Sequence, residues 1–114
     1  MKFIPFTKRY TPPIRAVIDA AAEEHDTNPL LFLASQKHPI ARARFIAMHL
    51  ARKRTGASYP TLAKAFSKGC HTTALNACRR AEEMLVSDPW AQDYAKRIAR
   101  RADRILLEQV SVRR

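Results

Sequence analysis

Residues 58–85, SYPTLAKAFSKGCHTTALNACRRAEEML, predict two helices joined by a tight turn. Ser58 is a favourable N-cap, and Pro60 suits the first helical turn, where no backbone donor is needed. The apolar residues of this first helix follow at helical spacing: Leu62, Ala65 and Phe66. Gly69 tolerates a positive φ, so we expect it at the C′ position that ends the helix.

A second helix is predicted to begin directly after the turn, with one apolar stripe along it. Its apolar residues recur at a period of about 3.6: Ala74, Ala77, Cys78, Ala81, Met84 and Leu85. The other face carries polar and basic residues: Thr72, Thr73, Asn76, Arg79 and Arg80. Such side chains suit contacts with base edges and phosphates in a major groove. The two helices therefore predict a helix-turn-helix that binds double-stranded DNA through its second helix.

The distribution of charge also indicates a polyanionic partner. The chain has 114 residues and a formal net charge of +11. No Asp or Glu occurs between Thr27 and Ala81. The basic residues in that interval are Lys37, Arg42, Arg44, Arg52, Lys53, Arg54, Lys64, Lys68, Arg79 and Arg80. Because a merely solvated surface normally mixes both signs, the acid-free interval favours an electrostatic binding surface.

The turn and second helix resemble the carboxyl-terminal DNA-binding domain of the bacterial replication initiator DnaA family. The family's second helix opens with Gly-Gly-Arg-Asp-His-Thr-Thr-Val, and residues 67–74 here are Ser-Lys-Gly-Cys-His-Thr-Thr-Ala. The matching positions are His71, Thr72, Thr73 and Arg79, and the resemblance implies that they contact DNA. Gly69 and Cys70 replace the family's Arg and Asp, while Lys68 supplies a positive charge one position earlier.

The resemblance runs from about residue 14 to residue 84 and includes a second basic segment. Arg42-Ala43-Arg44 is similar to the family's Arg-Pro-Arg at the start of a helix, with Arg44 at the matched position. Phe45 stands where the family often has Gln. The preceding loop, with Lys37 and His38, corresponds to a basic loop that reaches the minor groove in the family. The resemblance therefore adds Lys37, Arg42 and Arg44 to the expected DNA contacts.

The whole chain is predicted to be all-α, with about five to six helices. We expect an N-terminal arm over residues 1–10, one domain over 11–110 and a short tail over 111–114. Outside the helix-turn-helix, the expected helices are one capped by Thr11 and ending near His25, a short core plug at LLFLAS after Pro29, one over about 39–55 stopped by Gly56, and one from Pro89 to about Gln109.

The last predicted helix carries a basic stripe whose role the sequence leaves open. Its members are Lys96, Arg97, Arg100, Arg101 and Arg104. Acidic residues interrupt the stripe, so a solvated outer face is the favoured interpretation. Contact with flanking phosphates and self-association, or another protein partner, through this helix are the alternatives.

Several functional classes are not supported by the sequence. With only Gly56 and Gly69 in the chain, no P-loop or dinucleotide fingerprint is present, and we expect no enzyme and no cofactor. Cys70 and Cys78 are not spaced as a metal or disulfide framework. No apolar run is long enough to cross a bilayer. We expect a cytoplasmic, nucleoid-associated protein with no metal, membrane or small-molecule substrate, and without the ATPase module that DnaA proteins carry.

Two hypotheses from different classes follow. The first is a sequence-specific double-stranded DNA-binding protein that resembles the DnaA domain and regulates replication or transcription. The alternative is a basic helical adaptor that binds an acidic protein partner. Binding to duplex DNA with a steep salt dependence would separate the first from the second.

Overall fold

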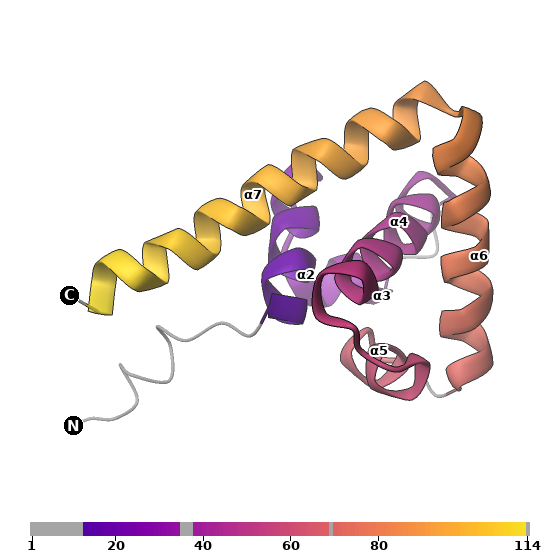
Figure 1. Ribbon diagram of the computed structural model, residues 1–114, viewed down its shortest axis with the longest axis horizontal. Helices are drawn as coiled ribbons and strands as arrows, with labels where there is room; N and C mark the ends of the chain where they lie inside the picture. The colour runs from indigo at the N-terminus through magenta and orange to yellow at the C-terminus, as the bar shows by residue number, and fades with distance from the viewer. Residues whose placement is uncertain (1–12, 35–37, 69, 114) are drawn as a thin grey trace.

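The computed structural model describes residues 13–34, 38–68 and 70–113, and within them it contains helices and no strand (Figure 1). The helices are α2 (Pro13–Glu24), α3 (Pro29–Ala34), α4 (His38–Thr55), α5 (Tyr59–Ala65), α6 (His71–Ser87) and α7 (Pro89–Arg113). The all-α prediction is confirmed. The predicted arm, residues 1–10, and the Thr11 cap lie outside the described residues.

Helix α4 runs through the middle of the fold and packs against α2, α6 and α7. Figure 1 shows α6 along one edge of the molecule and α7 crossing over α2. Many of the buried residues on the facing surfaces are alanines, such as Ala20 on α2, Ala47 on α4 and Ala77 on α6. Small side chains allow helices to approach closely, and larger residues, including Phe32, Phe66 and Tyr94, fill the remaining core.

The start of α5 agrees with its sequence signals. The Ser58 side chain accepts a hydrogen bond from the backbone N–H of Thr61 at 3.3 Å, and Pro60 lies in the first turn. Ser58 is therefore the N-cap, as predicted.

The end of α5 differs from the prediction that Gly69 would occupy C′. Ser67 adopts the left-handed conformation, with φ of 59°, and its N–H donates to the Lys64 carbonyl at 3.1 Å. The Lys68 N–H donates to the Ala63 carbonyl at 2.6 Å. These two bonds form a Schellman motif, which satisfies carbonyls at the helix end and offsets the strain at a non-glycine residue. The helix stops here because buried Phe66 anchors its last turn; Gly69 itself lies outside the described residues.

Two other expectations need correction. The predicted core plug, α3, buries only Phe32, while Leu30 and Leu31 are 76% and 58% exposed, because a short surface helix presents only one side to the core. Helix α7 continues to Arg113 instead of ending near Gln109, since no Gly or Pro follows Pro89 to stop it. The predicted tail over 111–114 is therefore helical as far as Arg113.

Three arginines of the predicted outer stripe of α7 instead face α2. Arg97 and Arg101 bind Glu24 at 2.7 and 2.8 Å, and Arg104 binds Glu23 at 2.8 Å. These pairs are partly exposed, so each contributes at most about 1 kcal/mol to stability. They fix the side of α7 that packs on α2, and they leave Lys96 and Arg100 as the members of the stripe that do not pair with α2.

Candidate nucleic-acid interface

The first turn of α6 presents its polar side chains to solvent. Cys70 is the N-cap residue, with extended backbone (φ −137°, ψ 134°) and no capping hydrogen bond from its side chain. His71, Thr72 and Thr73 follow inside the helix and are all exposed. Neither threonine occupies the N-cap of α6. The His71 and Thr73 side chains face solvent, and the exposed Thr72 side chain hydrogen-bonds the Cys70 sulfur.

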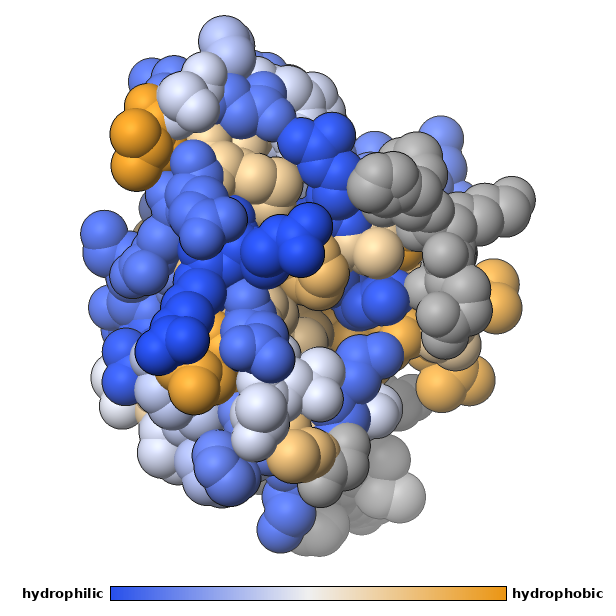
Figure 2. Space-filling model, turned by 90° about the vertical axis from the view of Figure 1, so that its right-hand side faces the viewer, coloured by the Kyte–Doolittle hydropathy of each residue, from blue (hydrophilic) through white to orange (hydrophobic). Residues whose placement is uncertain are grey.

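The exposed residues continue along the same side of α6. We call this set the polar face, and its members are His71, Thr72, Thr73, Asn76, Arg79 and Arg80. The opposite side packs into the core through Ala74, Ala77, Cys78 and Ala81. Figure 2, which views the molecule from the side that carries α6, shows a mostly hydrophilic surface with separate hydrophobic spots. The sequence prediction of which α6 residues face outward and which face inward is confirmed.

The two arginines of the polar face differ in their surroundings. Among the described residues, Arg79 has no carboxylate within ion-pair distance. The Arg80 guanidinium lies over the Phe45 ring of α4, 5.9 Å from its centroid. Phe45 thus supports Arg80 by a cation–π contact.

A positive cluster, formed by Lys68 and by Arg44 of α4, lies at the turn between α5 and α6. Arg44 is only 6% exposed, and its Nη1 donates to the Phe32 carbonyl at 3.2 Å. Burial lowers the pKa of Lys68, and the nearby Arg44 charge lowers that pKa further. Two like charges near a partly buried turn repel each other, and an anion bound beside Lys68 would offset that repulsion.

Arg42 is held by partners within the protein. Its Nη2 donates to Asp88 at 2.6 Å and approaches the Met84 sulfur at 3.6 Å, while its guanidinium lies over the Trp90 ring. This cluster ties the start of α4 to the corner between α6 and α7. The sequence analysis missed this role of Asp88, because the two partners are 46 residues apart and no local pattern links them.

The structure therefore brings together only part of the predicted DNA-binding set. The polar face and Lys68 lie on or beside the helix-turn-helix, whereas the guanidinium groups of Arg42 and Arg44 bind partners within the protein. Lys37 lies outside the described residues.

We expect Arg42→Ala to lower the free energy of unfolding by about 1 kcal/mol, because a partly exposed ion pair and a cation–π contact are lost. Its effect on the salt dependence of DNA binding should be near zero. Urea unfolding and a salt titration measure the two quantities. If the variant keeps its stability but loses about one unit of salt slope, Arg42 contacts phosphate instead.

The described residues offer little for other chemistry. They contain no group of three His, Cys, Asp or Glu side chains that could hold a metal ion. Cys70 is exposed and Cys78 is buried, and both are free thiols. None of the helices in the described part is both long and apolar enough to span a membrane.

Two helices joined by a tight turn, with the second carrying an exposed polar face, define a helix-turn-helix domain, a class that binds DNA. The family model described as the bacterial DnaA protein helix-turn-helix matches residues 14–81. That match covers more than half of the chain, so the protein belongs to this family and its helix-turn-helix is a DNA-binding element.

Individual relatives support the same assignment. The chromosomal replication initiator protein DnaA of Laribacter hongkongensis is 47% identical over 57 residues, which cover 49% of this chain and 12% of that protein. The protein of the same name from Acinetobacter baylyi is 35% identical over 80 residues, covering 68% of this chain and 17% of that protein. The chain thus matches less than a fifth of the length of these relatives.

Proposed function

We propose that this protein binds double-stranded DNA in a sequence-specific manner and regulates replication or transcription at the nucleoid in the cytoplasm. The observation that carries the proposal is the polar face of α6, which is exposed, free of carboxylates from His71 to Arg80 and backed by buried small residues on the opposite side of the helix. The names of the relatives, which are replication initiators, favour a role in replication.

The polar face has two parts suited to different contacts. His71, Thr72 and Thr73 lie in the first turn, where a recognition helix meets base edges, and a threonine methyl group can contact thymine. Arg79 lies six residues beyond Thr73, which is about 9 Å along the helix axis. At that distance its guanidinium suits the phosphate backbone at the edge of the groove. The first part would supply specificity and the second would supply affinity.

The turn should give this protein its own sequence preference. Gly69 and Cys70 stand where the family has Arg and Asp. The two replacements remove one cation and one hydrogen-bond acceptor from the turn. We therefore expect a preferred site that differs from the usual initiator box or is recognised less strictly. Selection of bound duplexes from a random pool would identify it.

A salt titration tests the proposal. If the protein neutralises about five phosphates, log affinity for duplex DNA should fall with log salt at a slope of roughly −4 to −5. Measuring single-stranded RNA and an acidic polypeptide in parallel separates duplex binding from general attraction to polyanions. A slope near zero, or equal affinity for the acidic polypeptide, would remove the basis of the proposal and favour the adaptor alternative.

A further inference from the structure

A hollow lies between the first half of α4 and the second half of α6, beside the polar face. Its volume is about 520 Å³, and the side chains that line it include Arg42 and Phe45 of α4 and Arg80, Glu83 and Met84 of α6. The two guanidinium groups in this hollow differ in their availability. Arg42 already binds Asp88, whereas Arg80 forms no ion pair with any described residue.

The Phe45 ring is the side chain that holds Arg80. The Arg80 Cζ lies over the ring, 5.9 Å from its centroid, and among the described residues this is the only ionic, hydrogen-bonding or ring contact of the Arg80 side chain. Phe45 is half-buried and packs against the core, so the core keeps the ring in place. The guanidinium therefore has a fixed support on α4, although Arg80 itself is exposed.

Glu83 is the alternative partner of Arg80. The two residues are three positions apart on α6, a spacing at which oppositely charged side chains can meet on a helix surface. They form no ion pair in the structure, although both line the same hollow. An aromatic ring attracts a cation without neutralising its charge, as a carboxylate would. By holding Arg80 apart from Glu83, Phe45 leaves the positive charge available to an anion from outside.

The position of Arg80 along α6 suits contact with a phosphate. Arg80 lies seven residues beyond Thr73, which is about two helical turns or roughly 10 Å, so both side chains leave α6 on nearly the same side. When the first turn of α6 enters a major groove, Arg80 comes to the edge of that groove, where the phosphate backbone lies. A guanidinium can bind two phosphate oxygens by parallel hydrogen bonds.

We propose that Phe45 is a positioning residue for DNA binding, because its ring holds the Arg80 guanidinium apart from Glu83 and ready to bind a backbone phosphate. The inference rests on the proposed function, since it requires duplex DNA along the polar face. It adds a residue of α4 that sets the affinity of α6 by acting through Arg80. A side chain that is already held in place loses less entropy on binding.

Anisotropy titrations of a labelled duplex with the full chain, at several salt concentrations, test the inference. Phe45→Leu keeps an apolar side chain but removes the ring, so Arg80 can turn to Glu83. Affinity should fall about threefold to tenfold, and the salt slope should decrease by up to about one unit. Phe45→Tyr restores a ring and should recover both quantities. In an Arg80→Ala background, Phe45→Leu should cause no further loss.

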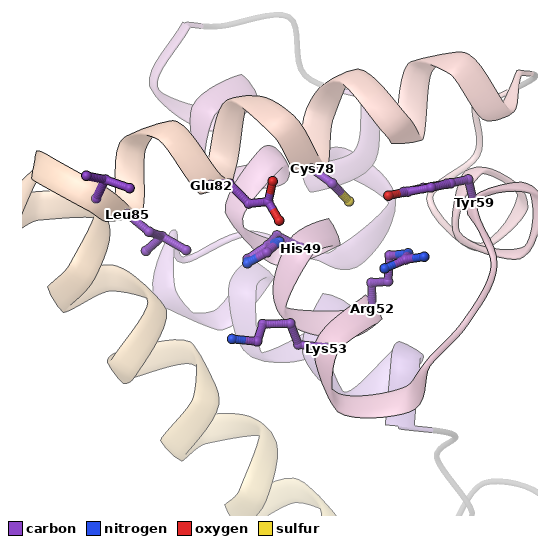
Figure 3. A pocket seen from close by; sticks show the side chains of 8 residues that line it. His49, Arg52, Lys53, Tyr59, Cys78, Glu82 and Leu85 are labelled. Atoms are coloured by element: carbon purple, nitrogen blue, oxygen red, sulfur yellow. The ribbon is translucent and has the colours of Figure 1, made fainter.

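A carboxylate substitution tests the competition with Glu83. Glu83→Gln should raise affinity more in the Phe45→Leu variant than in the unmodified protein, because it removes the partner that captures Arg80. Glu82→Gln is the matched control, since it removes the same charge one position earlier. In Figure 3 the Glu82 side chain projects toward His49 of α4, in a separate hollow of about 410 Å³. Its effect should be equal in the two backgrounds, because residues two apart on a helix do not face each other.

The outcomes separate this inference from the proposed function. If the unmodified protein shows no salt-dependent binding to duplex DNA, the proposed function fails and the inference fails with it. If the unmodified protein binds, but Phe45→Leu keeps its affinity and salt slope, only the inference is overturned. An equal loss from Phe45→Leu in the Arg80→Ala background, with circular dichroism showing folded protein, also overturns it, because Phe45 would then not act through Arg80.

Discussion

Replacing Thr73 by alanine is expected to weaken binding to the preferred duplex by about 1–3 kcal/mol and to leave binding to a scrambled duplex nearly unchanged. The reason is its position in the first turn of α6, exposed and not used as the helix cap. Arg79→Ala should instead weaken all sequences alike and reduce the salt slope by about one unit, because a phosphate contact carries no sequence information.

Competition binding with preferred and scrambled duplexes measures this difference. Ser87, exposed in the last turn of the same helix, provides a control position, and Ser87→Ala should change neither quantity. If Thr73→Ala and Arg79→Ala lower preferred and scrambled binding by the same ratio, the first turn of α6 does not determine specificity.

Phe66→Ala is expected to lower the free energy of unfolding by about 3–5 kcal/mol. Phe66 is fully buried and caps the end of α5, immediately before the strained Ser67 turn. Its removal leaves a cavity where the two helices of the helix-turn-helix meet the rest of the core. Since a domain of this size is stable by only about 5–15 kcal/mol, the variant should be close to its unfolding threshold.

Urea unfolding of Phe66→Ala, compared with Phe45→Ala, measures that loss. Phe45 is only partly buried, so its replacement should cost clearly less. A loss below about 1 kcal/mol for Phe66→Ala would show that this side chain does not anchor the helix-turn-helix.

Most helix ends could be predicted from the sequence, because each is set by a residue at or next to it. Ser58, for example, supplies its own capping oxygen, and Gly56 follows α4 with φ of +71°, which glycine accepts without strain. The left-handed residue after α5 was placed wrongly at Gly69, because burial of Phe66 sets where the chain turns and a Schellman motif makes Ser67 acceptable there. Local propensity alone does not contain that information.

Parts of the site were predictable for the same reason. A helix of known register has a known outer face, so the polar face of α6 follows from the spacing of Ala74, Ala77 and Ala81. The environment of Arg42 does not follow from residue spacing, because it depends on Asp88 and Trp90, which approach Arg42 only in the folded chain. The same holds for the α7 arginines that pair with Glu23 and Glu24.

Alkylation of Cys70 tests most directly whether the start of α6 enters DNA. Cys70 is exposed at the N-cap, and a hydrogen bond from the Thr72 side chain is the main cause that lowers its thiol pKa. Cys78 is buried, which raises its thiol pKa, so it serves as a slowly reacting internal control.

The alkylation rate of Cys70 is measured by mass spectrometry with iodoacetamide, in the absence of ligand and with saturating preferred duplex or an acidic polypeptide. Duplex bound to the polar face should slow the reaction at Cys70 by at least about tenfold, because the thiol is then covered, while the acidic polypeptide should have little effect. An unchanged rate at Cys70 with duplex fully bound would contradict the account, because DNA would then occupy a different surface.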